Sequence, residues 1–385
     1  MPDIYTPTEM LAKLVSFPTV SRDTNIPLID FVAGYLAGHG VESHRVTSPC
    51  GTKQNLYALV GPSVDGGVVL SGHTDVVPID GQEWTTDPWL LTEKNGRLYG
   101  RGSCDMKGFV ALSLAAVPKA LSSGLKRPLQ LALTYDEETG MDGAKRLVPE
   151  MAANMPTAEA VVVGEPSEMQ VVTAHKGGLM FMTHVRGFEV HSSLVHTGVS
   201  AVMIAARLVG WLDDRMVESR AAAKPDSLFV PPYTTFHVGR ITGGTATNIT
   251  AKDCSFSCDI RRLPADMGID WLGRYRAECD RLAAEMRAIH PDTGIDIEVI
   301  GDIPGCRPEQ ALAAEALCRQ LTGDNAEHVV SYGTEAGLFQ DGGYSVCICG
   351  PGAIGQAHQP DEFIEISEMQ AGERFMDRLI ARLAA

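Results

Sequence analysis

Three observations predict an α/β protein with a second, inserted α+β domain. Strand-like apolar runs and amphipathic helical segments alternate over residues 1–178, as in a sheet covered by helices. Residues 179–302 instead follow the order β-α-β-β-α-β, which is the ferredoxin-like motif. The alternation resumes over residues 303–385, so the first domain is predicted to be discontinuous and the second to be inserted in it.

Length and composition describe an ordinary globular protein. The 385 residues include 44% hydrophobic and 21% charged residues, and this length favours two or three domains. A net charge of −16 argues against nucleic acid or an anionic membrane surface as a partner. No signal peptide and no run of ~18 apolar residues is evident. Nine scattered cysteines without a Cys-x-x-Cys pair indicate reduced thiols, and we expect a cytoplasmic protein.

In the first domain, helical spacing of apolar residues predicts helices and continuous apolar runs predict buried strands. The predicted helices are 9–15, 26–36, 108–121 and 143–151, then one early in the last segment and one from residue 367. The predicted strands are 44–46, 55–60, 68–71, 129–134, 160–164 and 345–349. Asn95-Gly96 predicts a hairpin turn between two further short segments.

The inserted domain has its own pattern. Alternating residues predict strands, and two apolar or amphipathic segments predict helices. The strands are 179–185, 234–241, 250–260 and 295–300, and the helices are 200–216 and 271–289. The Gly243-Gly244 pair predicts the turn between the two middle strands. One face of this sheet would stay available for docking.

The stretch LSGHTD at 70–75 ends the central strand of the first domain. Ligands of open α/β sheets bind beyond the carboxyl ends of the strands. His73 could ligate a metal through one ring nitrogen while the Asp75 carboxylate takes the other N–H and fixes the tautomer. A buried structural histidine beside a capping aspartate is the alternative.

Four further segments place acidic or imidazole groups next to predicted strands or a helix start. They are Asp105 in GRGSCDMKG, the acidic run 136–138 in DEETG, Glu165 in VGEPS and His358 in GQAHQPDE. Taken singly, each has a plain alternative: a helix N-cap, a solvated acidic turn or a surface histidine. Taken together, they suggest one cluster at one edge of the sheet.

Two histidines and at least three carboxylates without a thiolate suit zinc, cobalt or manganese. This exceeds the three protein ligands of a single catalytic zinc. It fits a dinuclear site with ions about 3.5–4 Å apart that share a carboxylate. The adjacent Glu137 and Glu138 could then supply one general base and one ligand.

Specific motifs run in order through nearly the whole chain: SGHTDVVP, YGRGSCDMKG, DEETG and GEP. With these motifs the sequence resembles the dinuclear-metal amidohydrolases that include acetylornithine deacetylase, succinyl-diaminopimelate desuccinylase, carboxypeptidase G-type enzymes and aminoacylase. GTEAG at 333–337 and GPGAIGQAHQPDEF at 350–363 are most similar to the acetylornithine deacetylase branch. The resemblance implies a zinc-exopeptidase-like α/β/α catalytic domain with an inserted ferredoxin-like lid and dimerisation domain.

The resemblance also implies roles at the metals. Two divalent ions are expected, with zinc in first place and cobalt in second. His73 and Glu165 would bind one ion, Glu138 and His358 the other, and Asp105 would bridge them. Asp75 would orient His73, and Glu137 would be the general base. The resemblance further implies a cis peptide between Asp105 and Met106.

Substrate contacts are implied at five positions. His191 in HSS, Asn248 in GGTATN and Arg261 in DIRR match the inserted domain's motifs, with Asn248 and Arg261 on the acyl oxygen and the carboxylate. Thr334 and Glu335 of GTEAG are the two further positions. Some relatives carry another lid histidine where this chain has Met203, so the group that stabilises the oxyanion stays open, with His191 or His196 as possible substitutes.

The function implied is hydrolysis of N2-acetyl-L-ornithine to L-ornithine and acetate, in arginine biosynthesis. The partner would be a small N-acyl amino acid, and the protein would be a homodimer through the inserted domain. The apolar helix near 201–209 could serve that interface or the domain's own core. A desuccinylase, a broad N-acyl-amino-acid hydrolase, a dipeptidase and a non-catalytic binding protein are the alternatives.

Overall fold

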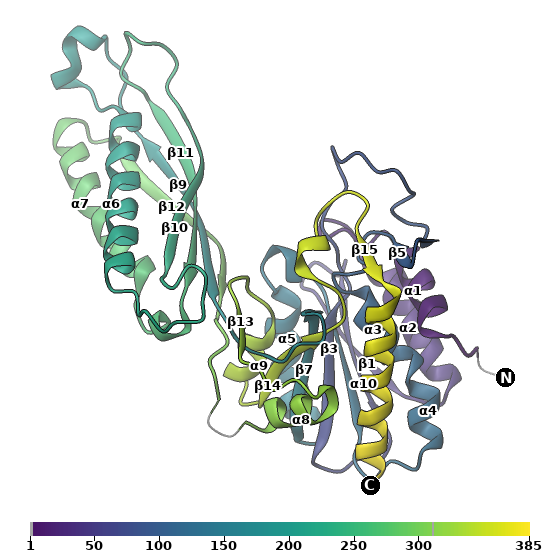
Figure 1. Cartoon of the computed structure of the whole chain (residues 1–385). Helices are drawn as coiled ribbons and strands as arrows, with labels where there is room; N and C mark the ends of the chain where they lie inside the picture. The colour runs from purple at the N-terminus through teal and green to yellow at the C-terminus, as the bar shows by residue number, and fades with distance from the viewer. Residues whose placement is uncertain (1–2, 310–311) are drawn as a thin grey trace. The chain divides into compact units, whose positions relative to one another are not determined.

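The structure is a computed structural model that describes residues 3–309 and 312–385 (Figure 1). The chain forms two compact units, which are described separately. The first comprises Met1–Ala174, Cys306–His328 and Thr334–Ala385. The second comprises His175–Gly305 and Val329–Gly333.

An eight-stranded mixed sheet organises the first unit. In spatial order its strands are β1 (Ser43–Thr47), β2 (Gln54–Val60), β6 (Leu129–Thr134), β3 (Gly67–His73), β7 (Ala158–Pro166), β14 (Val346–Gly350), β8 (Val172–His175) and β13 (His328–Val330). The four neighbours β6, β3, β7 and β14 are parallel. Every residue of β3 and β6 is buried, as expected for parallel strands covered on both faces.

Helices cover this sheet in an α/β/α arrangement. They are α1 (Pro7–Val15), α2 (Ile26–Gly38), α3 (Lys107–Ala115), α4 (Val117–Ser122), α5 (Asp142–Asn154), α8 (Ala313–Thr322), α9 (Ala336–Asp341) and α10 (Ile366–Ala384). Val68 and Leu70 of β3 share one hydrophobic core with Phe109 of α3 and Leu317 of α8. Helix α5 contacts β2 and β6. A small sheet of β4 (Thr92–Lys94), β5 (Arg97–Tyr99) and β15 (Phe363–Glu365) contains the predicted Asn95-Gly96 hairpin turn.

For the segment after Asp105, one expectation was wrong and one alternative is ruled out. The predicted single helix over 108–121 is two helices, with the break at Ala116. Pro118 lies in the first turn of α4, where its missing N–H costs least, and it could not continue α3. Asp105 is also not a helix N-cap, because α3 begins at Lys107 with Met106 as its N-cap. The Asp105–Met106 peptide is cis, as the resemblance implied.

The second unit has a four-stranded antiparallel sheet in the order β10 (Thr235–Gly243), β11 (Asp253–Arg262), β9 (Gly177–Arg186) and β12 (Gly294–Ile303). Helices α6 (Ala201–Ala221) and α7 (Trp271–Ile289) lie side by side on one face (Figure 1). Ile204 and Leu208 of α6 pack in this unit's own core with Phe256. The chain order is the predicted β-α-β-β-α-β, and the predicted fold class is confirmed.

Across the described ranges 3–309 and 312–385, no helix combines the length and hydropathy that crossing a bilayer requires.

Candidate metal centre

The parallel strands of the first unit deliver polar side chains to one edge of the sheet. β3 ends in His73, β7 carries Glu165 near its end, and β6 runs into the acidic turn at 136–138. β14 leads into the loop that carries His358. Because these four strands are parallel, their carboxyl ends meet at the same edge.

Asp105 lies between the two imidazoles. Its Oδ1 is 3.0 Å from His73 Nε2, and its Oδ2 is 3.2 Å from His358 Nε2. This is the arrangement that a bridging carboxylate needs. The side chains of His73 and Asp105 are buried, while His358 is 51% exposed and could admit a ligand from solvent.

The remaining acidic groups divide between the two imidazoles. Both carboxylate oxygens of Glu138 are within 3.1 Å of His358 Nε2, and Glu165 Oε1 is 3.8 Å from His73 Nε2. Potential ligand atoms of His73, Glu137 and Glu165 lie within 4.8 Å of one another. The same holds for His73, Asp105 and Glu138. Because His358 Nε2 contacts Asp105 and Glu138, the structure groups all five predicted metal ligands and the predicted base.

Asp75 contacts its neighbours through two different groups. Its backbone carbonyl lies 2.9 Å from His73 Nδ1 and orients the ring, whereas its carboxylate Oδ1 is 3.7 Å away. The carboxylate accepts hydrogen bonds from the Ser21 hydroxyl at 2.7 Å and from the Glu137 and Glu138 N–H groups at 3.2 and 3.4 Å. Asp75 therefore also holds the acidic turn.

The charged groups in this cluster shift one another's pKa values. Burial, reinforced by neighbouring carboxylates, raises the pKa of Glu137 and Glu165 well above the ordinary value and that of Glu138 to about 7. Hydrogen bonds to Asp105 and Glu138 raise the pKa of His358 to about 10. For Asp105, burial disfavours the ionised form, but the contacts with His358 and His73 lower its pKa below the usual range.

These residues fit a pair of divalent cations. Four carboxylates share one small volume with two imidazoles, so the site favours added positive charge. Glu165 Oε1 is buried and has no hydrogen-bond partner among the described residues, as expected of an oxygen that a cation would satisfy. Imidazole and carboxylate donors without thiolate suit zinc or cobalt.

The remaining predicted substrate contacts fall into two groups. His191, Asn248 and Arg261 belong to the second unit. There His191 Nδ1 is 2.8 Å from Ser193 Oγ, the Asn248 carbonyl accepts from the Ser192 N–H, and Arg261 Nε donates to Asp259 at 3.0 Å.

Thr334 and Glu335 belong to the first unit and are almost completely buried. The Thr334 hydroxyl accepts from the Ala336 N–H at the start of α9. Glu335 Oε2 is 3.4 Å from the Ser71 hydroxyl on β3. Burial raises the pKa of Glu335 to about 7, although Thr134 and the charge of His73 act in the other direction. A direct substrate contact by these two residues stays a prediction.

Sequence reasoning missed several residues that support the cluster. Ser21 holds Asp75, and the buried pair Arg101 and Glu362 holds the turn that carries Asp105. Arg101 and Glu362 lie inside motifs already recognised, YGRGSCDMKG and QPDEF. The available signal was an arginine inside one ligand motif and an acidic residue inside the other.

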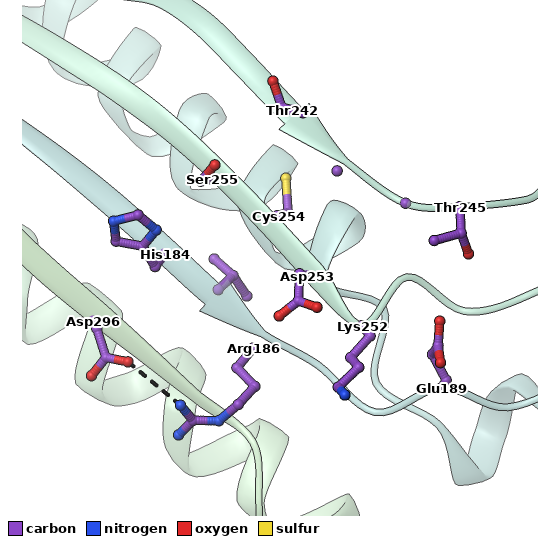
Figure 2. A pocket seen from close by; sticks show the side chains of 13 residues that line it. His184, Arg186, Glu189, Thr242, Thr245, Lys252, Asp253, Cys254, Ser255 and Asp296 are labelled. Atoms are coloured by element: carbon purple, nitrogen blue, oxygen red, sulfur yellow. Dashed lines mark ion pairs between the residues drawn. The ribbon is translucent and has the colours of Figure 1, made fainter.

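A separate pocket of about 420 Å³ lies on the second unit, at the ends of β9 and β11 (Figure 2). Its lining includes Arg186, paired with Asp296 at 3.7 Å, and Lys252 and Asp253. Its charged side chains are exposed and of both signs, and its lining includes none of the predicted site residues. We therefore assign no binding site to this pocket.

Comparisons with known proteins agree with this geometry. The model of peptidase family M20/M25/M40 matches residues 69–382. The acetylornithine deacetylase of Myxococcus xanthus is 36% identical to the chain over 383 residues, which cover 96% of each sequence.

Two solved structures share the fold. The M20 family metallo-carboxypeptidase Sso-CP2 from Sulfolobus solfataricus matches with a TM-score of 0.78 at 18% identity, covering 99% of this chain and 100% of that chain. The Bacillus subtilis YXEP protein, a dinuclear metal binding peptidase from the M20 family, matches with a TM-score of 0.64 at 12% identity, covering 98% and 97%.

Proposed function

The chain belongs to peptidase family M20/M25/M40, and from this premise we propose that it hydrolyses the acetamide bond of N2-acetyl-L-ornithine. The products are L-ornithine and acetate, and the reaction would serve arginine biosynthesis. The chain is a metal-dependent amidohydrolase, and the resemblance found in its motifs is confirmed.

The metal centre supports the chemical part of this proposal. His73 and Glu165 would hold one divalent ion, Glu138 and His358 the other, and Asp105 would contact both. Zinc is the first candidate and cobalt the second. When bound, the ions supply Lewis acidity, which polarises the amide carbonyl and makes water a stronger acid.

Glu137 is the proposed general base. It takes a proton from water, whose oxygen bonds to the acetyl carbon, and it returns that proton to the leaving amine as the C–N bond breaks. The Asp75 carboxylate accepts the Glu137 N–H and so fixes the turn that carries this base. In the second unit, Arg261 is proposed to bind the substrate carboxylate and Asn248 the acyl oxygen. His191 is the third proposed contact there, and an isolated β-bridge places it beside Ile249, the residue after Asn248.

The substrate is inferred from one observation. The relative at 36% identity over 96% of both chains is named acetylornithine deacetylase. The metal ligands serve amide hydrolysis in general, so they do not by themselves choose among N-acyl amino acids.

The first experiment assays the purified, metal-loaded protein on four substrates: N2-acetyl-L-ornithine, N-succinyl-diaminopimelate, N-acetyl-methionine and a dipeptide. We expect N2-acetyl-L-ornithine to have the highest kcat/KM. A higher value for any of the other three would replace the proposed substrate while leaving the amidohydrolase chemistry intact.

The second experiment tests Glu137 as the general base. Glu137→Gln keeps the side-chain shape but cannot accept the proton, so kcat should fall by about 10²-fold or more. Bound zinc, measured by elemental analysis, should stay near two ions per chain. Loss of zinc together with activity would mean that Glu137 is a ligand instead.

Two further features belong to the proposal. All nine cysteines are free thiols, which supports a cytoplasmic location. We also propose a homodimer through the second unit, where Leu194, Val195 and Met203 are half exposed or more, although most apolar residues of α6 serve the unit's own core. Light scattering of the purified protein measures this state, and a monomeric mass would contradict it.

A further inference from the structure

We propose that Glu362 is a positioning residue for the metal centre. Its carboxylate, paired with Arg101, fixes the turn that presents Asp105 against the loop that presents His358. The inference rests on the proposed function, because it takes Asp105 and His358 as metal ligands. All the residues involved belong to the first unit.

The Glu362 carboxylate binds one turn with both of its oxygens. Oε1 accepts the N–H groups of Cys104 at 3.0 Å and Asp105 at 3.1 Å. Oε2 accepts the Gly102 N–H at 3.1 Å and a guanidinium N–H of Arg101 at 2.7 Å. Four donors from 101–105 thus converge on one side chain that is more than 250 positions away along the chain.

Burial makes these contacts consequential. The side chains of Arg101 and Glu362 are each only 1% exposed, so water cannot replace a lost partner. A carboxylate buried to this degree needs paired charge or several hydrogen bonds, and Glu362 has both. Removing it would leave three backbone N–H groups and one guanidinium N–H of Arg101 without an acceptor.

The same pair reaches the other ligand. Gln82 accepts from Arg101 through its side-chain oxygen and donates from Nε2 to the His358 carbonyl at 2.8 Å. The next residues of that loop are fixed as well, because the Asp361 carboxylate accepts the Thr85 N–H at 2.8 Å. One network therefore sets the backbone on both sides of the Asp105–His358 contact of 3.2 Å.

Removing a group that hydrogen-bonds to a metal ligand and orients it typically lowers metal affinity by about 10–100-fold. Asp105 is the proposed ligand to both ions, so movement of its turn should weaken both. A residue that merely stabilised the fold would lower thermal stability and leave metal affinity unchanged.

The experiment measures zinc affinity by competition with a chelator in wild type, Glu362→Gln and Gln82→Ala, alongside the absorption spectrum after cobalt loading. We expect Glu362→Gln to lose about 10–100-fold in zinc affinity and to shift the cobalt bands. Gln82→Ala should lose less affinity, because it removes the contacts of Gln82 with Arg101 and the His358 carbonyl but leaves the four hydrogen bonds that Glu362 accepts.

Glu159→Gln is the matched control. Glu159 also pairs with arginines, at 3.0 Å from Arg127 and 2.7 Å from Arg382, but it lies at the start of β7, whereas Glu165 lies near its end. This variant should lose thermal stability without metal and keep the wild-type zinc affinity and cobalt spectrum.

The outcomes separate the two proposals. Two zinc ions bound with wild-type affinity by both Glu362→Gln and Gln82→Ala would overturn the positioning role alone. Failure of the wild-type protein to bind two ions would overturn the metal centre and this inference with it. If Glu362→Gln does not fold, Gln82→Ala decides, because Gln82 is only partly buried.

Discussion

His175 is a completely buried imidazole at the first position of the second unit. Its Nδ1 lies 2.9 Å from the Lys176 carbonyl and would carry the ring proton, while Nε2 has no hydrogen-bond partner among the described residues. Burial lowers the pKa of His175 from 6.5 to about 4. The folded protein therefore holds this ring neutral through a range where the unfolded chain protonates it.

The sign of the resulting pH dependence follows from proton counting. Between pH 6.5 and about 4 the unfolded state binds more protons at His175, so stability falls as pH falls. This group accounts for up to about 3 kcal/mol of that loss. His175→Gln should reduce the fall in the urea-unfolding free energy between pH 7 and pH 4 by this amount. The exposed His184 changed to Gln is the control, and parallel profiles for wild type and His175→Gln would refute the assignment.

Single residues also show how far local spacing could predict the site. The His73–Asp75 spacing correctly placed the two residues together, but the expected contact between the ring and the Asp75 carboxylate was wrong. The backbone carbonyl contacts the ring at 2.9 Å, which releases the carboxylate for the turn at Glu137. Both the backbone carbonyl and the carboxylate of Asp75 lie near His73 Nδ1, and tertiary packing determines which of them contacts the ring.

Among the elements, β7 and α3 pack unusually closely at Gly164. A Cβ on Gly164 would lie 1.9 Å from the Phe109 ring, so only glycine fits beside this helix. Gly164 precedes Glu165, and this close contact helps fix the position of the β7 end that carries Glu165.

Gly164→Ala should therefore destabilise the first unit by about 1–3 kcal/mol through overpacking. Gly34→Ala is the matched control in the same unit, since its Cβ would meet nothing within 4 Å on helix α2. The control should be neutral or stabilise by up to about 1 kcal/mol. Urea unfolding of both metal-free variants measures this, and equal stability of the two would contradict the packing argument.

Periodicity predicted the long elements and missed the short ones. The final helix and α7 have full amphipathic patterns, and β3 and β6 are continuous apolar runs. Strand β13 and helix α9 have only three and six residues, too few for a period to show. The break at Ala116 carried a visible signal, because a proline two residues later cannot continue a helix.

Across the whole molecule, the grouping of the proposed metal ligands was predictable, because four of the five lie at or beyond the end of a strand of one parallel set. The network of Arg101 and Glu362 was not, since its contacts join residues about 260 positions apart by burial rather than by any local period. Roles for His191, Asn248 and Arg261 depend on tertiary arrangement, which spacing within the second unit does not encode.

The two units should respond differently to metal. Each has its own hydrophobic core, and all five proposed ligands belong to the first unit. Each unit also contains two of the four tryptophans: Trp84 and Trp89 in the first, Trp211 and Trp271 in the second. Double Trp→Phe variants of either pair therefore leave a fluorescence probe in one unit only.

Zinc at 100 times the dissociation constant of one site adds about 2.7 kcal/mol to the stability of the state that binds it. The thermal midpoint reported by Trp84 and Trp89 should rise with zinc and return on adding a chelator, because all five proposed ligands lie in the first unit. The midpoint reported by Trp211 and Trp271 should stay constant, since nothing in that unit is proposed to bind the ions. Equal rises in both would mean that the units unfold together or that the second unit also contributes a ligand.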